Sequence, residues 1–112
     1  MLRKMLHERA YLQVVGEAAD GIDAIAQARL LRPDVILMDI VMPHMDGVEA
    51  TERIRAELPE IQVFALSMQA RSETAHAIEH AGAAGYFVKG LDTQRLLDRL
   101  LTLHANRAGS LL

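Results

Sequence analysis

The chain contains no cysteine, no tryptophan and only two tyrosines and two phenylalanines in 112 residues. The lack of cysteine excludes a disulfide scaffold and fits a reducing compartment. No apolar run approaches the roughly 18 residues that a membrane span needs. Charged residues also interrupt the opening of the chain, which therefore lacks the apolar core of a signal peptide. Basic residues are not in excess, since the net charge is −3. This domain is therefore not expected to bind nucleic acid by itself, because binding to phosphates needs a basic surface. A cytoplasmic protein with no membrane contact is the expected class.

Short apolar runs alternate with amphipathic segments along the chain. Because strict alternation of strands and helices is typical of βαβ units, the pattern predicts a parallel sheet with helices on both faces. A chain of this length forms one domain, and a hydrophobic fraction of 51% suits a sheet that is covered on both sides. The expected strands are Gln13–Glu17, Val35–Asp39, Gln62–Leu66 and Gly85–Val88, and the expected helices are Gly21–Leu31, Gly47–Glu57, Arg71–Ala81 and Asp92–His104.

The segment from Asp34 to Gly47 is the most informative part of the sequence. Its apolar run ends in Asp39, and a turn marked by Pro43 follows before the next helical pattern begins. A continuous apolar run is typical of a strand buried on both faces. Asp39 is therefore expected at the carboxyl end of a central strand, where open α/β sheets carry their chemistry. It could bind a cation, act as a nucleophile toward phosphorus, or cap the next helix, although Asp46 is better placed to cap.

Three segments in this order and spacing resemble the receiver domains of bacterial two-component response regulators. They are Leu37–Gly47, Phe64–Ser67 and Gly82–Lys89, and the resemblance runs from about Leu2 to about Leu103. Two further matches, Val15–Gly21 and Leu31–Asp34, are similar to the branch of the family that carries a helix-turn-helix output domain. The resemblance implies a flavodoxin-like fold and assigns residues 1–105 to a receiver-like domain. Residues 106–112 would form a tail or the start of a linker.

The resemblance also implies a set of site residues. Asp39 matches the phosphoacceptor, Lys89 the family's lysine, and Ser67 the switch hydroxyl. Tyr86 matches an aromatic residue whose rotamer reports the phosphorylated state. Such residue types suit phosphoryl transfer to a carboxylate, because the reaction depends on hydrogen-bond donors and a cation held beside the phosphoryl oxygens. Read without the resemblance, Ser67 is an ordinary strand-end turn serine and Lys89 a solvent-exposed lysine.

One part of the family pattern is missing at the start of the chain. Receiver domains open with a strand that ends in two acids, whereas residues 1–9 resemble the end of the family's first helix. The implied Mg²⁺ site would keep only the carboxylate of Asp39 and the backbone carbonyl of Val41, so magnesium binding is expected to be weak. Glu17 and Asp20 are possible substitutes, but Asp20 more simply caps the following helix. Either the protein is naturally shortened or its start was assigned late in a longer frame.

The missing strand also creates a structural problem. In the flavodoxin-like order 2-1-3-4-5 the first strand lies between the second and the third. Its absence would leave about four strands and a gap of roughly 9–10 Å lined by unpaired backbone. We expect Gln13–Glu17 to close onto Val35–Asp39 or to pair with a neighbouring chain. A homo-oligomer with an exchanged N-terminal segment is the corresponding prediction.

A second motif suggests different chemistry. His76, Glu79 and His80 match H-x-x-E-H, the inverted zinc-protease motif, and the two histidines are spaced to share one helical face. A catalytic zinc needs a third protein ligand and a cleft, and only Asp92 and Asp98 follow downstream. An exposed helix face that binds nickel or zinc incidentally is therefore the preferred interpretation.

Three functions remain open from the sequence. The first is a phosphorylation switch that accepts its phosphoryl group from a histidine kinase and is not itself an enzyme. By resemblance its output would be a DNA-binding domain after Leu112, in a regulator of transcription. The second is a phosphorylation-independent module for dimerisation or protein docking. The third is a fragment of an ordinary switch.

Overall fold

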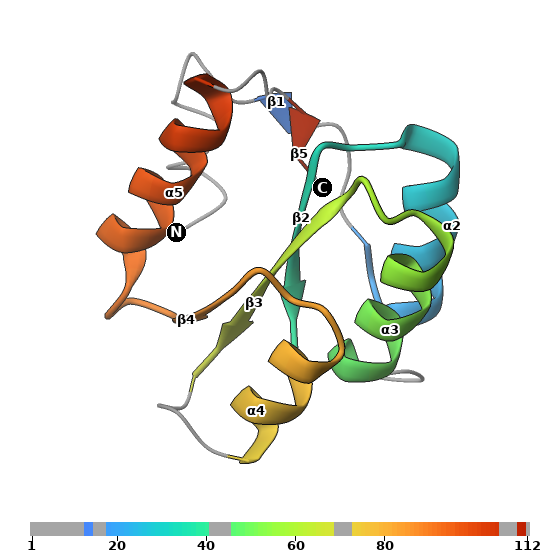
Figure 1. Ribbon diagram of the computed structural model, residues 1–112, viewed down its shortest axis with the longest axis horizontal. Coiled ribbons are helices and arrows are strands. Elements are labelled where there is room, and N and C mark those ends of the chain that lie inside the picture. Colours follow the sequence, from blue (N-terminus) through green and yellow to red (C-terminus); the bar gives the residue numbers. More distant parts are fainter. Residues whose placement is uncertain (1–12, 15–17, 41–45, 69–72, 106–109, 112) are drawn as a thin grey trace.

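The computed structural model describes residues 13–14, 18–40, 46–68, 73–105 and 110–111. Strands and helices alternate through these parts of the chain, as Figure 1 shows. The strands are β1 (Gln13–Val14), β2 (Val35–Asp39), β3 (Gln62–Ser67), β4 (Gly85–Val88) and β5 (Ser110–Leu111). The helices are α2 (Gly21–Leu31), α3 (Gly47–Glu57), α4 (Glu73–His80) and α5 (Thr93–Ala105).

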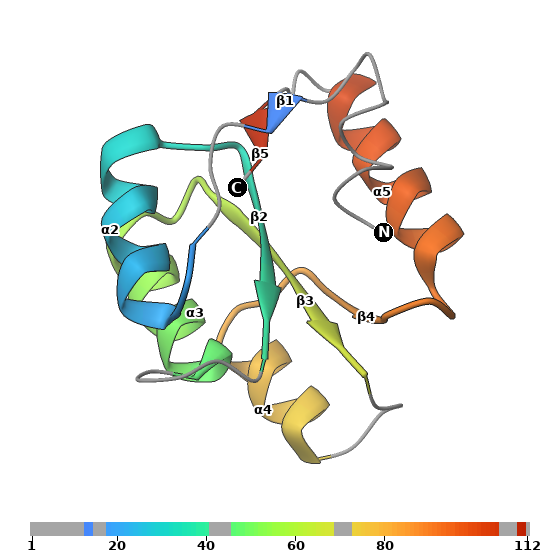
Figure 2. The same ribbon diagram turned by 180° about the vertical axis from the view of Figure 1, so that it is seen from behind.

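The strands form one sheet in the order β1-β5-β2-β3-β4, and all of the described pairs are parallel. β2 and β3 pair over the full length of β2, from Val35 opposite Gln62 to Asp39 opposite Leu66. The views in Figures 1 and 2 show α2 and α3 on one side of the sheet and α5 on the other. The predicted flavodoxin-like α/β fold with helices on both faces is confirmed. No helix in the described part of the chain is long and apolar enough to cross a bilayer.

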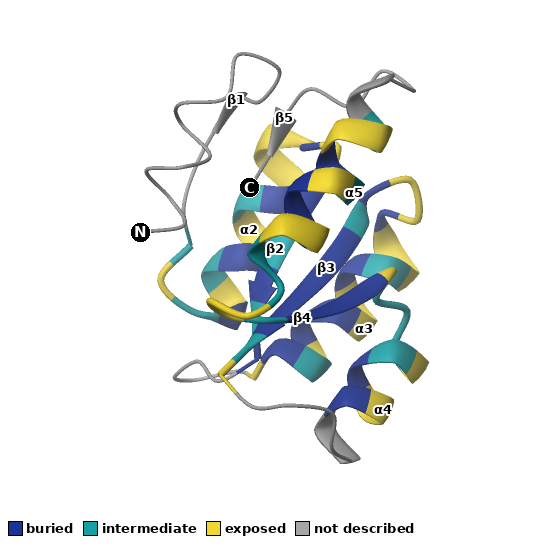
Figure 3. Ribbon diagram, turned by 90° about the vertical axis from the view of Figure 1, so that its left-hand side faces the viewer, coloured by how far each residue is buried: buried dark blue, intermediate teal, exposed yellow. Residues whose placement is uncertain are grey.

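Alternate residues of the central strands divide the core between the two faces. Ile36 and Met38 of β2 pack with α2 and α3, whereas Val35 on the same strand packs with α5. Figure 3 shows most of β2, β3 and β4 as buried. On the α5 side, Phe64 and Phe87 join Leu96, Leu97 and Leu100. Because the sheet is covered on both faces, its strands are continuously apolar rather than alternating, and this explains the apolar runs in the sequence.

Local signals set the ends of the helices. Asp20 and Asp46 are the N-caps of α2 and α3, and their carboxylates accept from the backbone N–H of Asp23 and Glu49. Both capping roles were predicted from the sequence and are confirmed. α2 ends at Leu31, and Arg32 then adopts a left-handed conformation with φ of 48° before the buried Pro33. Gly82 follows α4 with φ of 114°, a positive φ of the kind that favours glycine just after a helix end.

Some predicted boundaries differ from the structure. α5 begins and ends one residue later than predicted, and β3 extends to Ser67. α4 runs from Glu73 to His80, inside the predicted range of residues 71–81. β1 is described only at Gln13 and Val14, and the rest of that predicted strand lies outside the described residues. Such shifts are ordinary, because helix and strand ends depend on tertiary contacts that periodicity does not contain.

The expected gap beside β2 is filled, and this corrects the predicted count of about four strands. Ser110 and Leu111, which the sequence analysis assigned to a tail, form β5 between β1 and β2. Leu111 lies opposite both Val14 and Val35. β1 therefore does not close directly onto β2. Backbone groups left unpaired in this gap would be costly, and pairing with a short segment from the far end of the chain satisfies some of them. Oligomer formation stays a prediction.

Asp92, which precedes α5, gives a prediction about acid stability. Its carboxylate accepts from the backbone N–H of Val88 at 2.7 Å, and this hydrogen bond, followed by Arg95, lowers the pKa of Asp92. Because the folded-state pKa is below the ordinary value, the resulting stability is present above about pH 4 and is lost as pH falls through the lowered pKa. We expect Asp92→Asn to reduce the loss of stability below pH 4 in acid titrations followed by circular dichroism. Asp98→Asn is the matched control for the loss of one carboxylate, and a difference from the parent no larger than that of the control would contradict the prediction.

Candidate functional site

The candidate site lies at one edge of the sheet, where three neighbouring strands end. Asp39 is the last residue of β2, Ser67 is the last residue of β3, and Lys89 directly follows β4. Because the strands are parallel, their carboxyl ends meet at the same edge. The backbone connects them as well, since the Lys89 N–H donates to the carbonyl of Ser67 at 2.8 Å. The fold thus collects the three residues that the sequence analysis singled out.

Lys89 and Asp39 form a direct ion pair. The Nζ atom of Lys89 lies 2.7 Å from the Oδ2 atom of Asp39, and the side chains are 36% and 43% exposed. Asp39 ends β2 and Lys89 follows β4, and β3 lies between these two strands, so the ion pair spans the end of β3. Partial exposure leaves the carboxylate open to a reactant from solvent. The arrangement therefore combines an accessible oxygen nucleophile with an adjacent cation.

Gly47, the first residue of α3, holds that helix against the end of β2. Its N–H donates to the carbonyl of Ile40 at 2.9 Å. A Cβ atom at Gly47 would lie 2.6 Å from the backbone oxygen of Asp39 and 2.9 Å from the Cα of Ile40. Only glycine permits this approach, because both neighbours are backbone atoms that cannot turn away. The sequence predicted Gly47 only as the first residue of a helix, and its packing role beside Asp39 was missed.

Tyr86 is buried beneath the site. Only 3% of its surface is exposed, and it packs with Ile40, Ala65, Ala75 and Ile78. Two of these residues belong to α4, so the tyrosine joins the sheet to that helix. A change in its rotamer would have to displace packed side chains of α4.

The described residues do not fit a tight magnesium site. Among them, no group of three His, Cys, Asp or Glu side chains could hold a metal ion. Asp39 is paired with Lys89, and Asp20, considered as a substitute ligand, caps α2. Val41, expected to contribute its carbonyl, lies outside the described residues. Among the described residues, a hard cation that prefers six oxygen ligands thus finds one carboxylate at this edge, already bonded to an ammonium group.

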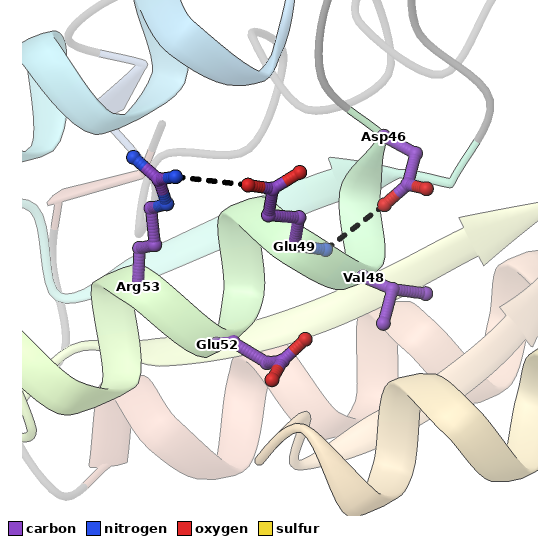
Figure 4. A pocket seen from close by; sticks show the side chains of 5 residues that line it. All are labelled: Asp46, Val48, Glu49, Glu52 and Arg53. Atoms are coloured by element: carbon purple, nitrogen blue, oxygen red, sulfur yellow. Dashed lines mark hydrogen bonds and ion pairs between the residues drawn. The ribbon is translucent and has the colours of Figure 1, made fainter.

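A shallow hollow lies elsewhere, on the first turns of α3. Figure 4 shows its lining, in which Glu49 pairs with Arg53 at 2.9 Å and Asp46 caps the helix. The remaining lining residues are Val48 and Glu52. None of Asp39, Ser67 and Lys89 contributes to this hollow. Asp46, Glu49 and Arg53 have their partners within the helix and its cap, so the hollow adds nothing to the candidate site.

His76 and His80 are exposed on α4. Their spacing of four residues on one helix is as predicted, but Asp92 and Asp98 belong to the segment at α5, which packs on the other side of the sheet. No three-ligand metal group is found in the described part of the chain. The protease interpretation therefore gains no support, and incidental nickel binding stays a prediction.

These features define a parallel α/β domain with an aspartate–lysine pair at the carboxyl edge of its sheet. The model of the response regulator receiver domain family matches residues 1–101. The chain therefore belongs to the receiver domains of response regulators, which are signalling modules. This finding confirms the resemblance derived from the sequence.

Relatives and solved structures agree with that assignment. The response regulator protein VraR of Staphylococcus aureus is 40% identical over 93 residues, which cover 83% of this chain and 44% of VraR. The chain thus spans less than half of the length of this relative. A two-component response regulator of the LuxR family from Aurantimonas sp. SI85-9A1 superimposes with a TM-score of 0.83 and 32% identity, covering 96% of this chain and 76% of that one. The signal receiver domain of the putative response regulator NarL from Mycobacterium tuberculosis also gives 0.83, at 27% identity, covering 95% and 86%.

Removal of the lysine from the ion pair should leave the fold stable. Because both side chains are more than one third exposed, we expect Lys89→Ala to change the free energy of unfolding by less than about 1 kcal/mol. Urea denaturation of the parent chain and the variant measures this difference. A loss much larger than this would mean that the pair is structural rather than a site poised for chemistry.

Proposed function

We propose that the chain is the phosphoryl-accepting domain of a two-component response regulator, with Asp39 as the acceptor. The observation that carries the proposal is the 2.7 Å pair between Lys89 and Asp39 at the carboxyl edge of the sheet. A partly exposed carboxylate can act as a nucleophile. A cation beside it can then stabilise the negative charge of the phosphoryl group that it accepts. The donor in this proposal is a phosphohistidine of a histidine kinase, so the domain is an acceptor and not an enzyme.

The chemistry uses residues of this chain directly. A carboxylate oxygen of Asp39 attacks phosphorus, the new O–P bond forms, and the P–N bond to the kinase imidazole breaks. The imidazole keeps the bonding electron pair and leaves the site. The Lys89 ammonium offsets charge on the phosphoryl oxygens, and the hydroxyl of Ser67 donates to one of them. Movement of Ser67 toward that oxygen would then be relayed to Tyr86, which packs against α4.

A second candidate is a receiver-derived module that docks or dimerises without phosphorylation. The donor set favours it, because the described residues do not fit a tight magnesium site and Lys89 already satisfies Asp39 as an ion pair. In this case the Asp39–Lys89 pair holds the ends of β2 and β4 together. The two functions differ in one measurable property, which is whether Asp39 accepts a phosphoryl group when Mg²⁺ is present.

The relatives support a proposal for the output domain and for the cellular setting. We propose that the domain belongs to a cytoplasmic regulator of transcription, since structurally similar chains include a LuxR-family response regulator. DNA would then be bound by a separate domain beyond the part described here. Self-association into a homo-oligomer, with or without exchange of the N-terminal segment, is part of the proposal.

Acetyl phosphate labelling tests the proposed function. The chain is incubated with acetyl phosphate and Mg²⁺, and its intact mass is measured beside Asp39→Ala and the matched surface variant Asp98→Ala. A gain of one phosphoryl group in the parent and in Asp98→Ala, lost in Asp39→Ala, supports the acceptor function. No gain in the parent, in magnesium or manganese, rejects it in favour of the docking module.

A further inference from the structure

The connection between β4 and α5, residues 88–92, determines where Lys89 lies. Lys89 is the first residue after β4, and its side chain is 36% exposed. Gly90 follows with φ of +80°, and apart from its chain neighbours no atom lies within 4 Å of the position of a Cβ there. Packing at Gly90 therefore does not fix the backbone after Lys89. A long and flexible lysine side chain needs a fixed backbone to place its ammonium group on Asp39.

The peptide unit between Val88 and Lys89 is bonded at both ends. Its N–H, which belongs to Lys89, donates to the carbonyl of Ser67 on β3 at 2.8 Å. Its carbonyl, which belongs to Val88, accepts from the N–H of Asp92 at 2.9 Å and from the N–H of Leu91 at 3.2 Å. The two polar groups of a trans peptide unit point in opposite directions. The unit is therefore held from one side by β3 and from the other side by the residues that precede α5.

The carboxylate of Asp92 bonds to the same end of the strand. Its Oδ2 atom accepts from the N–H of Val88 at 2.7 Å, so the backbone N–H and the carbonyl of Val88 are both bonded to Asp92. An ionised acceptor makes a shorter and stronger hydrogen bond than a neutral one. The side chain of Asp92 is 26% exposed, which limits competition from water. Asp92 thus closes residues 88–92 into a hydrogen-bonded ring that contains Lys89.

Asp92 is itself held by α5. Its carbonyl accepts from the N–H of Leu96, a buried residue of that helix, at 2.9 Å. The Nη2 atom of Arg95 lies 3.4 Å from the Oδ2 atom of Asp92 and donates to the carbonyl of Tyr86 at 2.6 Å. The guanidinium carbon of Arg95 lies 4.3 Å from the centroid of the buried Phe87 ring. The carboxylate therefore belongs to a rigid element, which is what a group that positions another residue requires.

We propose that Asp92 is a positioning residue for phosphoryl transfer to Asp39, and that it acts by holding the peptide unit between Val88 and Lys89. Its role is indirect, because its effect passes through this peptide unit to the Lys89 ammonium group, 2.7 Å from Asp39. The effect on the rate rests on the proposed function. The placement of Lys89, in contrast, can be measured without any phosphorylation.

Small displacements of Lys89 are expected to slow the reaction. The ammonium group offsets charge that develops on the phosphoryl oxygens, and this stabilisation depends on a preorganised geometry. A misplacement of about 1 Å can cost about 100-fold in rate. Loss of the Asp92 carboxylate frees the N–H of Val88 and opens the ring. We therefore expect Asp92→Ala to slow the phosphoryl labelling of Asp39 at least about tenfold.

NMR of the full chain with isotope-labelled lysine measures where the Lys89 ammonium group lies. Lys4 and Lys89 are the lysines of the chain, so Lys4→Arg assigns the two signals. An ammonium group that donates to a carboxylate exchanges its protons with water more slowly, and the Lys89 signal should therefore be visible in the parent and lost in Asp39→Ala. We expect Asp92→Ala to lose it as well. Asp92→Asn should keep it, because the amide oxygen still accepts from the N–H of Val88.

Asp20→Ala is the matched control for destabilisation. It removes a carboxylate that accepts from a backbone N–H at the start of another helix, α2. Its loss should lower stability without moving Lys89, so the ammonium signal should persist. The rate of labelling with acetyl phosphate and Mg²⁺ is then measured in the parent, Asp92→Ala and Asp92→Asn, and the asparagine variant should restore most of the rate.

A Lys89 signal that persists in Asp92→Ala overturns the positioning role, and so does its absence from the parent or its loss in Asp20→Ala. Loss of the signal in Asp92→Ala with an unchanged labelling rate overturns the effect on the reaction. A parent that shows the signal but is not labelled rejects the proposed function, while loss of the signal in Asp92→Ala still supports the placement of Lys89 by Asp92.

A milder variant keeps the proposal testable if Asp92→Ala does not fold. Asp92→Glu keeps the charge for Arg95 but adds one methylene, which moves the carboxylate relative to the N–H of Val88. It must weaken the Lys89 signal and slow labelling in the same direction. No change in that variant overturns the proposal.

Discussion

Gly47→Ala is expected to lower the free energy of unfolding by about 3 kcal/mol, near the upper end of the range for overpacking. The added Cβ would meet the backbone oxygen of Asp39 at 2.6 Å and the Cα of Ile40 at 2.9 Å. The hydrogen bond from Gly47 to Ile40 resists a shift of α3, so the strain falls on the end of β2. Urea denaturation measures the loss, and phosphoryl labelling should fall with it because Asp39 moves.

Gly90→Ala is the matched control for that prediction. Gly90 has φ of +80°, but no atom lies within 4 Å of the position of a Cβ. Alanine there suffers only backbone strain, of about 1 kcal/mol. Equal losses at the two glycines would contradict the close approach of α3 to the site.

Phe87→Ala is the second large expected effect, with a loss of about 3–5 kcal/mol in the free energy of unfolding. Phe87 is 1% exposed, and its ring centroid lies 5.5 Å from that of Phe64. The variant leaves a cavity under α5 and also removes the surface on which Arg95 rests. Thermal and urea denaturation both measure the loss in the free energy of unfolding.

Leu101→Ala is the comparison for Phe87→Ala, because Leu101 is a large apolar residue of α5, the helix that packs over Phe87, and is 50% exposed. Its loss should stay within about 0.5 kcal/mol, as for ordinary surface substitutions. A loss below about 1 kcal/mol for Phe87→Ala would mean that the sheet–α5 interface contributes little to stability.

The central elements were predictable because their signals are local. The apolar run of β2 gave its bounds from Val35 to Asp39, and the N-cap residues Asp20 and Asp46 fixed the starts of two helices. The site followed from topology, since Asp39 and Lys89 end parallel strands of one sheet. Periodicity and capping are properties of neighbouring residues, so a single sequence contains them.

Features that depend on distant pairing were not predictable. β5 consists of two residues that lie between β1 and β2, about 75 residues from the strand they meet at Val35. Two residues have no periodicity, so Ser110 and Leu111 could not be distinguished from a tail. The contact of Gly47 with Asp39 is likewise a property of packing. Glycine at that position has several local interpretations, and only the fold selects among them.

The central claim is that a phosphoryl group is accepted at Asp39, and chemical mapping of that group tests it most directly. The chain is treated with acetyl phosphate and Mg²⁺ and then reduced with borohydride, which converts an aspartyl phosphate to homoserine with release of phosphate. Peptide mass spectrometry then locates the converted residue. The account predicts homoserine at position 39 and at no other aspartate, with conversion lost in Lys89→Ala. Conversion at another aspartate, or none at any, would contradict it.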